Sequence, residues 1–173
     1  MTISDDDKTS DPPVRLEGSV KTVKRSDRGI ELVLRIRNPG DRALHCISDL
    51  RGLLYDPATR RLTVRLTDEG RILLPSAVAR LPRFAVIDPH SDAEIAVRLP
   101  AKIVKLADTP SPAGDVSMEE HSILDASEIE VDIAWADTPF YQDSRDVDDP
   151  RFPAVRWQQD ALHLSRPMRS RKR

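Results

Sequence analysis

The chain has almost no cysteine and few aromatic residues. Its 173 residues include a single cysteine, Cys46, and aromatic side chains make up only 4% of the composition. One cysteine excludes an intrachain disulfide framework, and a lone thiol is typical of a reducing compartment. A core with so few aromatic residues must come from Leu, Ile and Val. We therefore expect a cytoplasmic protein that folds without disulfide bonds.

Long hydrophobic runs are also missing. The longest apolar stretch, residues 72–79, is interrupted by Pro75 and is far shorter than a membrane span. The first seven residues lack the basic and apolar regions of a secretory signal. The formal net charge is only -2. We expect no association with a membrane.

The sequence lacks the common catalytic and nucleotide-binding motifs, since it contains no G-x-S-x-G, P-loop or G-x-G-x-x-G pattern. The acidic run at 143–149 lacks the central Gly and the terminal Glu of a calcium loop. Glu119 to His121 are consecutive and would diverge around a helix rather than share one ion. His45 and Cys46 are neighbours that a strand would place on opposite faces, which disfavours a dyad. We therefore assign no catalytic residue, no metal ligand and no cofactor.

The chain is rich in period-two alternation, which is typical of half-buried strands. In residues 30–37, four aliphatic side chains alternate with polar ones. Similar alternation in residues 128–135 places Trp135 on the face of Ile129, and we expect that ring to pack in the core. A weaker run at 16–23, with Leu16, Gly18, Val20 and Thr22 on one side, suits an edge strand. The other strands are expected at 43–55, 62–67, 84–87 and 93–99.

Turn signals separate these runs. Asn38 to Asp41 carries a Pro and a Gly, and Gly40 can take the positive φ that a type II turn requires. Proline-containing turns at 56–60 and 88–92 each lie between two strand-like runs and predict two hairpins. Ser117 to Glu120 matches a capping box, which predicts a turn or two of helix before the last strand.

Six or seven short alternating strands with almost no helix predict an all-β protein, namely an antiparallel two-sheet sandwich of Ig-like or fibronectin-III-like architecture. An open barrel is the structural alternative. The strand, Asn-Pro-Gly turn and strand at 32–44 are similar to those of many bacterial Ig-like modules, a resemblance that covers little of the chain and implies no activity. We expect a disordered acidic tail at 1–13, one domain at 14–164 and a basic tail at 165–173.

Five of the seven aromatic residues lie between Trp135 and Trp157, within an aromatic and acidic segment at 135–160. One interpretation is a corner in which Trp157 packs on Phe140 or Tyr141. The other is a protein-binding patch, because Trp, Tyr and Arg most often anchor interfaces. The candidate partner-binding residues are Asp137, Phe140, Tyr141, Arg156 and Trp157.

We expect a non-enzymatic module that binds another protein, associates with itself or serves as a subunit of a larger assembly, through this segment and an exposed strand edge. One alternative is a hydrolase with a loop-built acidic site that combines Asp137, Asp143 and Asp146 with a distant histidine. Another is nucleic-acid binding through the basic tail. The candidate contacts for nucleic acid are Arg169, Arg171, Lys172 and Arg173.

Overall fold

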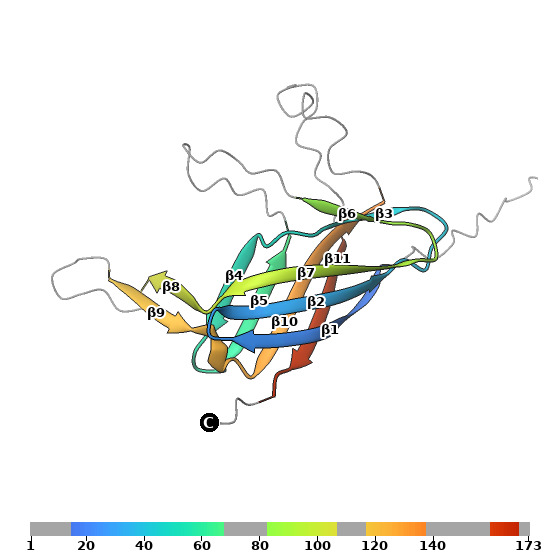
Figure 1. Cartoon of the computed structure of the whole chain (residues 1–173). Coiled ribbons are helices and arrows are strands. Elements are labelled where there is room, and N and C mark those ends of the chain that lie inside the picture. Colours follow the sequence, from blue (N-terminus) through green and yellow to red (C-terminus); the bar gives the residue numbers. More distant parts are fainter. Residues whose placement is uncertain (1–14, 68–82, 107–116, 138–159, 170–173) are drawn as a thin grey trace, which may run out of the picture.

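Two β-sheets face each other across an aliphatic core in the computed structural model of the chain (Figure 1). The structure describes residues 15–67, 83–106, 117–137 and 160–169. Almost all the regular structure of these residues is strand, and the only helical element described is one 3-10 turn. The predicted all-β sandwich is therefore confirmed.

The smaller sheet has three antiparallel strands in the order β1-β2-β7. In β2 the inward side chains are those that the alternation predicts, and Leu32, Leu34 and Ile36 are completely buried. The weak run near the start of the chain is an edge strand, as predicted. The strands are β1 (Glu17–Ser26), β2 (Gly29–Arg37) and β7 (Asp92–Pro100).

The larger sheet is built around β10 (Glu128–Ala136). Strand β11 (Asp160–Pro167) lies antiparallel along one edge of β10. The other edge is shared by two shorter strands, of which β5 (Arg61–Leu66) is parallel to β10 and β3 (Leu44–Ile47) is antiparallel. Outside these two lie β4 (Gly52–Asp56) and β6 (Phe84–Ile87). The parallel pair is a departure from the all-antiparallel expectation.

Trp135 lies near the end of β10 and packs in the core. Its side chain retains only 7% of its exposure, which confirms its predicted place in the core. The hairpin predicted around 56–60 is also confirmed, since β4 and β5 pair on either side of that turn. The single run predicted at 43–55 is wrong, because β3 and β4 are separate strands with different partners.

The hairpin predicted around 88–92 is wrong. Strand β6 belongs to the larger sheet and β7 to the smaller one, so the chain crosses between sheets at this turn. Asn38 holds the crossing, because its backbone N–H donates to Ser91 and its side chain donates to Ile87. Gly40 lacks the positive φ of the predicted type II turn, and its N–H instead donates to Oδ1 of Asn38. A local turn signal cannot distinguish a crossing from a hairpin.

The helix predicted from the capping box is wrong. Residues Met118–Ser122 form strand β9, which pairs with β8 (Lys102–Leu106) as a separate two-stranded ribbon. The 3-10 turn η1 (Ile123–Asp125) follows, and its N–H group at Leu124 donates to the Ser122 hydroxyl. Pairing with β8 satisfies the backbone that a helix would otherwise satisfy internally, so tertiary context overrides the local signal.

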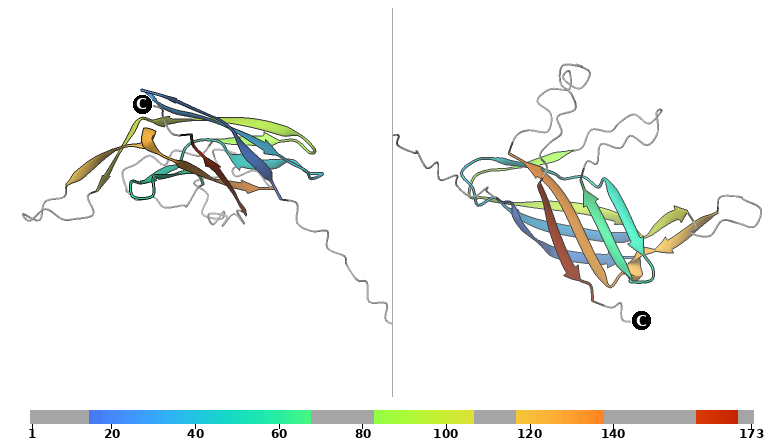
Figure 2. Two further views of the ribbon diagram at one scale, coloured as in Figure 1. Left: turned by 90° about the horizontal axis from the view of Figure 1, so that it is seen from below. Right: turned by 180° about the vertical axis from the view of Figure 1, so that it is seen from behind.

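The edge strands β1 and β11 lie across from each other where the two sheets meet (Figures 1 and 2). Gly18 of β1 sits so close to β11 that an added Cβ would lie 3.1 Å from Cδ2 of Leu162. The described residues of the two strands do not pair with each other. We refer to this junction of β1 and β11 as the seam.

Candidate functional site

The sequence-predicted protein-binding patch lies almost entirely outside the described residues. Asp137 is described and is exposed directly after β10. The other four candidates fall in 138–159, as do the two further acids of the hydrolase alternative. They are Phe140, Tyr141, Arg156, Trp157, Asp143 and Asp146. The patch therefore stays a prediction, and only its first residue has a known position.

The negative charge of Asp137 interacts with the imidazole of His45 in β3. Burial lowers the pKa of the His45 imidazole, and the negative charge of Asp137 opposes that shift to a smaller extent. The ring meets Phe84 edge to face, with centroids 6.2 Å apart. Its Nδ1 atom is buried and has no hydrogen-bond partner among the described residues. A neutral, apolar setting of this kind favours packing of the imidazole over acid-base work.

The β8–β9 ribbon is the most prominent surface feature that the sequence analysis missed. It lies between β7 and β10 in the chain and projects from the end of the sandwich (Figures 1 and 2). At its base, the N–H of Ile123 donates to the carbonyl of Ala101 at 3.0 Å, and Ile123 is completely buried. The base of the ribbon is thus tied to the core.

Beyond that base, the ribbon exposes apolar side chains. Val104 retains 60% of its exposure and Met118 retains 65%. The register places Met118 opposite Leu106, so Val104 and Met118 lie on the same face of the ribbon at diagonal positions. Each strand pairs only with the other within the described chain, so each has one edge without a strand partner. Exposed strand edges can accept another strand.

The charges on the ribbon differ between its strands. Lys102 and Lys105 lie on β8, and Glu119 and Glu120 lie on β9. Lys102 bonds Glu120 across the ribbon at 2.6 Å. The signal that could have revealed the ribbon was the β-branched pair Ile103 and Val104 after Pro100, which favours a strand. The stronger capping-box pattern in β9 obscured it.

Of the candidate contacts for nucleic acid, Arg169 alone is described. It follows β11 and lines a pocket at the seam together with Val23, Arg25, Arg166, Pro167 and Met168. Arg171, Lys172 and Arg173 lie outside the described residues. The structure therefore places one of the four predicted contacts in a specific pocket.

Histidines of the described residues meet carboxylates in pairs rather than in larger clusters. No group of three or more His, Cys, Asp or Glu side chains there could hold a metal ion. Two histidines pair with carboxylates at 2.7 Å, His90 with Asp41 and His163 with Asp132. Both imidazoles are more than half exposed, so water competes for these bonds. Neither pair forms the water-excluded site that the hydrolase alternative needs.

The comparisons with known proteins add no family. No family model matches the sequence, and no curated protein matches it. Two solved structures of β-glucosidase from Kluyveromyces marxianus, one in complex with glucose and one labelled with selenomethionine, are similar at 12% identity and a TM-score of 0.35. The matches cover 92% of this chain and 14% of the glucosidase chain. A TM-score this low carries no argument about fold or function.

Within the described residues, no helix has the length and apolar character to cross a membrane.

Proposed function

We propose that this chain is a non-enzymatic protein-interaction module of Ig-like architecture, and that the β8–β9 ribbon contacts the partner. The observation that carries the proposal is the exposure of Val104 and Met118 on one face of a ribbon that projects from the sandwich. The interaction class is the one predicted from sequence, but the proposed contact moves to a surface whose geometry is known.

Energetics support a role in binding. An isolated two-stranded ribbon is only marginally stable in water, and exposed apolar side chains on it do not improve its stability. Covering Val104 and Met118 would remove apolar surface from water, which favours association. A partner strand that pairs with the free edge of β9 would also satisfy backbone groups and reach Met118. The partner that fits is a protein that presents an extended segment with apolar side chains.

We also propose that the module works in the cytoplasm. Cys46 supports this location because it is the only cysteine of the chain and is buried as a free thiol. A protein without disulfide bonds tolerates a reducing compartment.

A differential pull-down tests the proposal. Tagged wild-type protein and a V104S/M118S variant are incubated with native lysate, and the bound proteins are compared by mass spectrometry. V86S is the matched control, because Val86 is 52% exposed but lies on β6 in the larger sheet. Substitutions at such exposed positions change stability by about 0.5 kcal/mol or less. A partner bound by wild type and V86S, and lost by V104S/M118S, supports the ribbon.

A second variant separates the ribbon from the sequence-predicted patch. If Y141A/W157A loses the partner while V104S/M118S retains it, the contact is the C-terminal aromatic segment and the ribbon proposal is wrong. If all variants bind the same proteins as wild type, neither surface is the contact. Circular dichroism of each variant confirms that loss of binding does not reflect loss of folding.

A further inference from the structure

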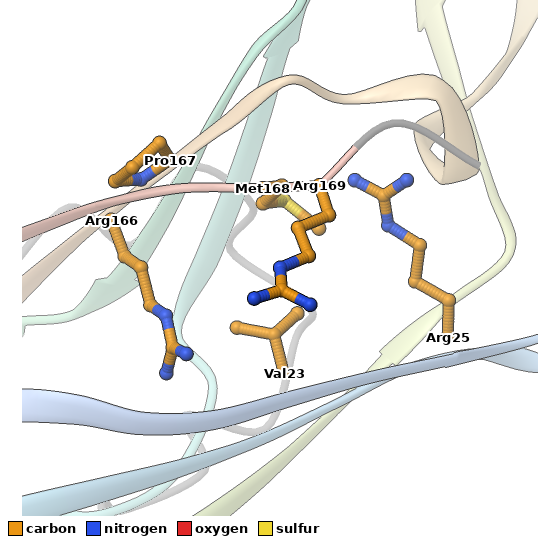
Figure 3. A pocket seen from close by; sticks show the side chains of 6 residues that line it. All are labelled: Val23, Arg25, Arg166, Pro167, Met168 and Arg169. Carbon is orange, nitrogen blue, oxygen red and sulfur yellow. The ribbon is translucent and has the colours of Figure 1, made fainter. Parts of the chain in front are cut away.

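A pocket of about 410 Å³ opens at the seam between the two sheets (Figure 3). Its lining contains three arginines, Arg25, Arg166 and Arg169, and no aspartate or glutamate. Val23, Pro167 and Met168 supply the remaining walls. Three guanidinium side chains therefore line one cavity together with apolar ones.

A β-bulge in β1 places one of these arginines. The register shifts between Val20 and Thr22, which leaves Lys21 without a cross-strand partner. Beyond the bulge, Val23 and Arg25 are paired with buried residues of β2. They therefore lie on the inner face of the sheet, and Thr22 does not. The sequence analysis placed Thr22 on the inner face, and the bulge makes that prediction wrong.

The second arginine enters the pocket from β11. Arg166 pairs with Ile129 of β10, which is completely buried. Because paired residues lie on the same face, the side chain of Arg166 projects from the inner face of the larger sheet. Its guanidinium donates to the carbonyls of Val20 and Lys21 at 2.7 Å each. These carbonyls lie at the bulge, so Arg166 ties β11 to β1 across the seam. Both acceptors are neutral carbonyls, so within the described residues the positive charge of Arg166 is uncompensated.

The third arginine, Arg169, is the one whose donors can bind a ligand. Arg169 makes no hydrogen bond or ion pair with any residue of the described chain. Figure 3 shows its guanidinium between Arg25 and Arg166, above Val23. Met168, its neighbour, is buried and its N–H donates to Ser127 at 2.7 Å, which fixes the backbone just before Arg169. The guanidinium of Arg169 thus lies near that of Arg166, whose described acceptors are neutral, and an anion between them would neutralise both charges.

We propose that this pocket binds the phosphate group of a small phosphorylated molecule. Guanidinium groups bind phosphate through two parallel N–H···O bonds, and Arg169 has its donors free of described partners. Val23 and Met168 place apolar surface beside the guanidinium groups, and an ion pair beside apolar surface is stronger than one in open water. The cavity has the size of a small-molecule site rather than of an extended groove for a strand of nucleic acid. The proposal is independent of the ribbon and its partner.

Calorimetric titration of the full chain with inorganic phosphate and with pyrophosphate tests the proposal. We expect both to bind, and R169Q to weaken the affinity for pyrophosphate by about tenfold or more, as the loss of a charge-assisted contact predicts. R169K keeps the positive charge but lacks the planar guanidinium with its paired donors, so its affinity for pyrophosphate should lie between those of wild type and R169Q. The matched control is R98Q, because Arg98 is exposed on the outer face of β7, away from the seam.

Three outcomes overturn the proposal. The first is that wild type binds neither anion at millimolar concentration. The second is that R169Q and R98Q lower the affinity for pyrophosphate equally, since a general charge effect then explains binding. The third is that a single-stranded decathymidylate binds more than tenfold tighter than pyrophosphate with a salt dependence of several phosphates, which would assign the arginines to nucleic acid. Circular dichroism of R169Q checks its fold, and the exposed position of Arg169 makes loss of folding an unexpected result.

Discussion

The side-chain amide of Asn38 donates a hydrogen bond of 2.9 Å to the carbonyl of Ile87, which joins the end of β2 to the end of β6. The same amide donates to the carbonyl of Arg42 at 2.6 Å, and Oδ1 accepts from the N–H of Gly40. Asn38 is completely buried, and its amide has partners for both donor and acceptor atoms. It therefore fixes two crossings between the sheets at one corner, from β2 to β3 and from β6 to β7.

The first prediction concerns that corner. Asn38→Ala should lower the free energy of unfolding by about 2 to 4 kcal/mol, because buried carbonyls lose their donors and a cavity remains. Urea unfolding followed by circular dichroism measures the change. Asn38→Asp has nearly the same volume but cannot donate, so it should destabilise the protein as much as Ala. A loss below about 0.5 kcal/mol for either variant would contradict the role of the amide.

The second prediction concerns Gly29, where β2 begins. Its φ is 143°, and an added Cβ would lie 2.0 Å from the carbonyl oxygen of Leu99. Gly29→Ala should therefore cost about 3 kcal/mol or more or prevent folding, because both the backbone conformation and the contact are unfavourable. Thermal unfolding and soluble yield report the effect.

Gly52→Ala provides the control for that substitution. Gly52 has no positive φ, and the nearest atom to its added Cβ is the Arg65 Cβ at 3.3 Å. The Ala variant at 52 should retain much more stability than the variant at 29. Equal losses at the two positions would show that the conformation of Gly29 has no special role.

Much of the fold follows from alternation in the sequence, because burial of one sheet face imposes period two on the side chains. Strands β2, β5 and β10 read this way, and Trp135 follows its strand into the core. Alternation does not predict where the chain crosses from one sheet to the other. Turns at 56–60 and 88–92 carry the same local signal, yet one closes a hairpin and the other crosses the core under the control of Asn38.

The candidate sites were harder to predict for a related reason. The seam pocket depends on the bulge at Lys21, which exchanges the faces of β1 beyond it, and no residue type in the sequence requires a bulge there. The ribbon depends on pairing between β8 and β9, two strands separated along the chain. Both features arise from contacts between distant residues, which local patterns do not encode.

The third prediction concerns the thiol of Cys46. Burial raises its pKa from 9.0 to about 12. The thiolate fraction at pH 8 should then be about a thousandfold lower than for an unperturbed thiol, and the buried sulfur is also inaccessible. We expect no reaction with a disulfide reagent in the native protein and full reaction in urea. Rapid labelling of one thiol under native conditions would contradict the buried position of Cys46.

The fourth prediction concerns pH and His45. Its pKa in the folded protein is lowered below the ordinary value of 6.5, chiefly by burial. The unfolded chain therefore binds more protons than the folded chain as the pH falls through about 6.5, so the free energy of unfolding should decrease on acidification. His45→Gln, which cannot be protonated there, should lose less stability than wild type between pH 7.5 and 5.5. Urea unfolding at three pH values measures the difference.

The difference between wild type and His45→Gln isolates the imidazole, because the remaining titratable groups are common to both proteins. Asp137→Asn adds a second check. Removing this carboxylate removes the charge that opposes the shift, so the pKa of His45 should fall further and its NMR titration should move to lower pH. A His45 titration that moves to higher pH, or a wild-type stability that rises on acidification relative to His45→Gln, would contradict burial as the dominant cause.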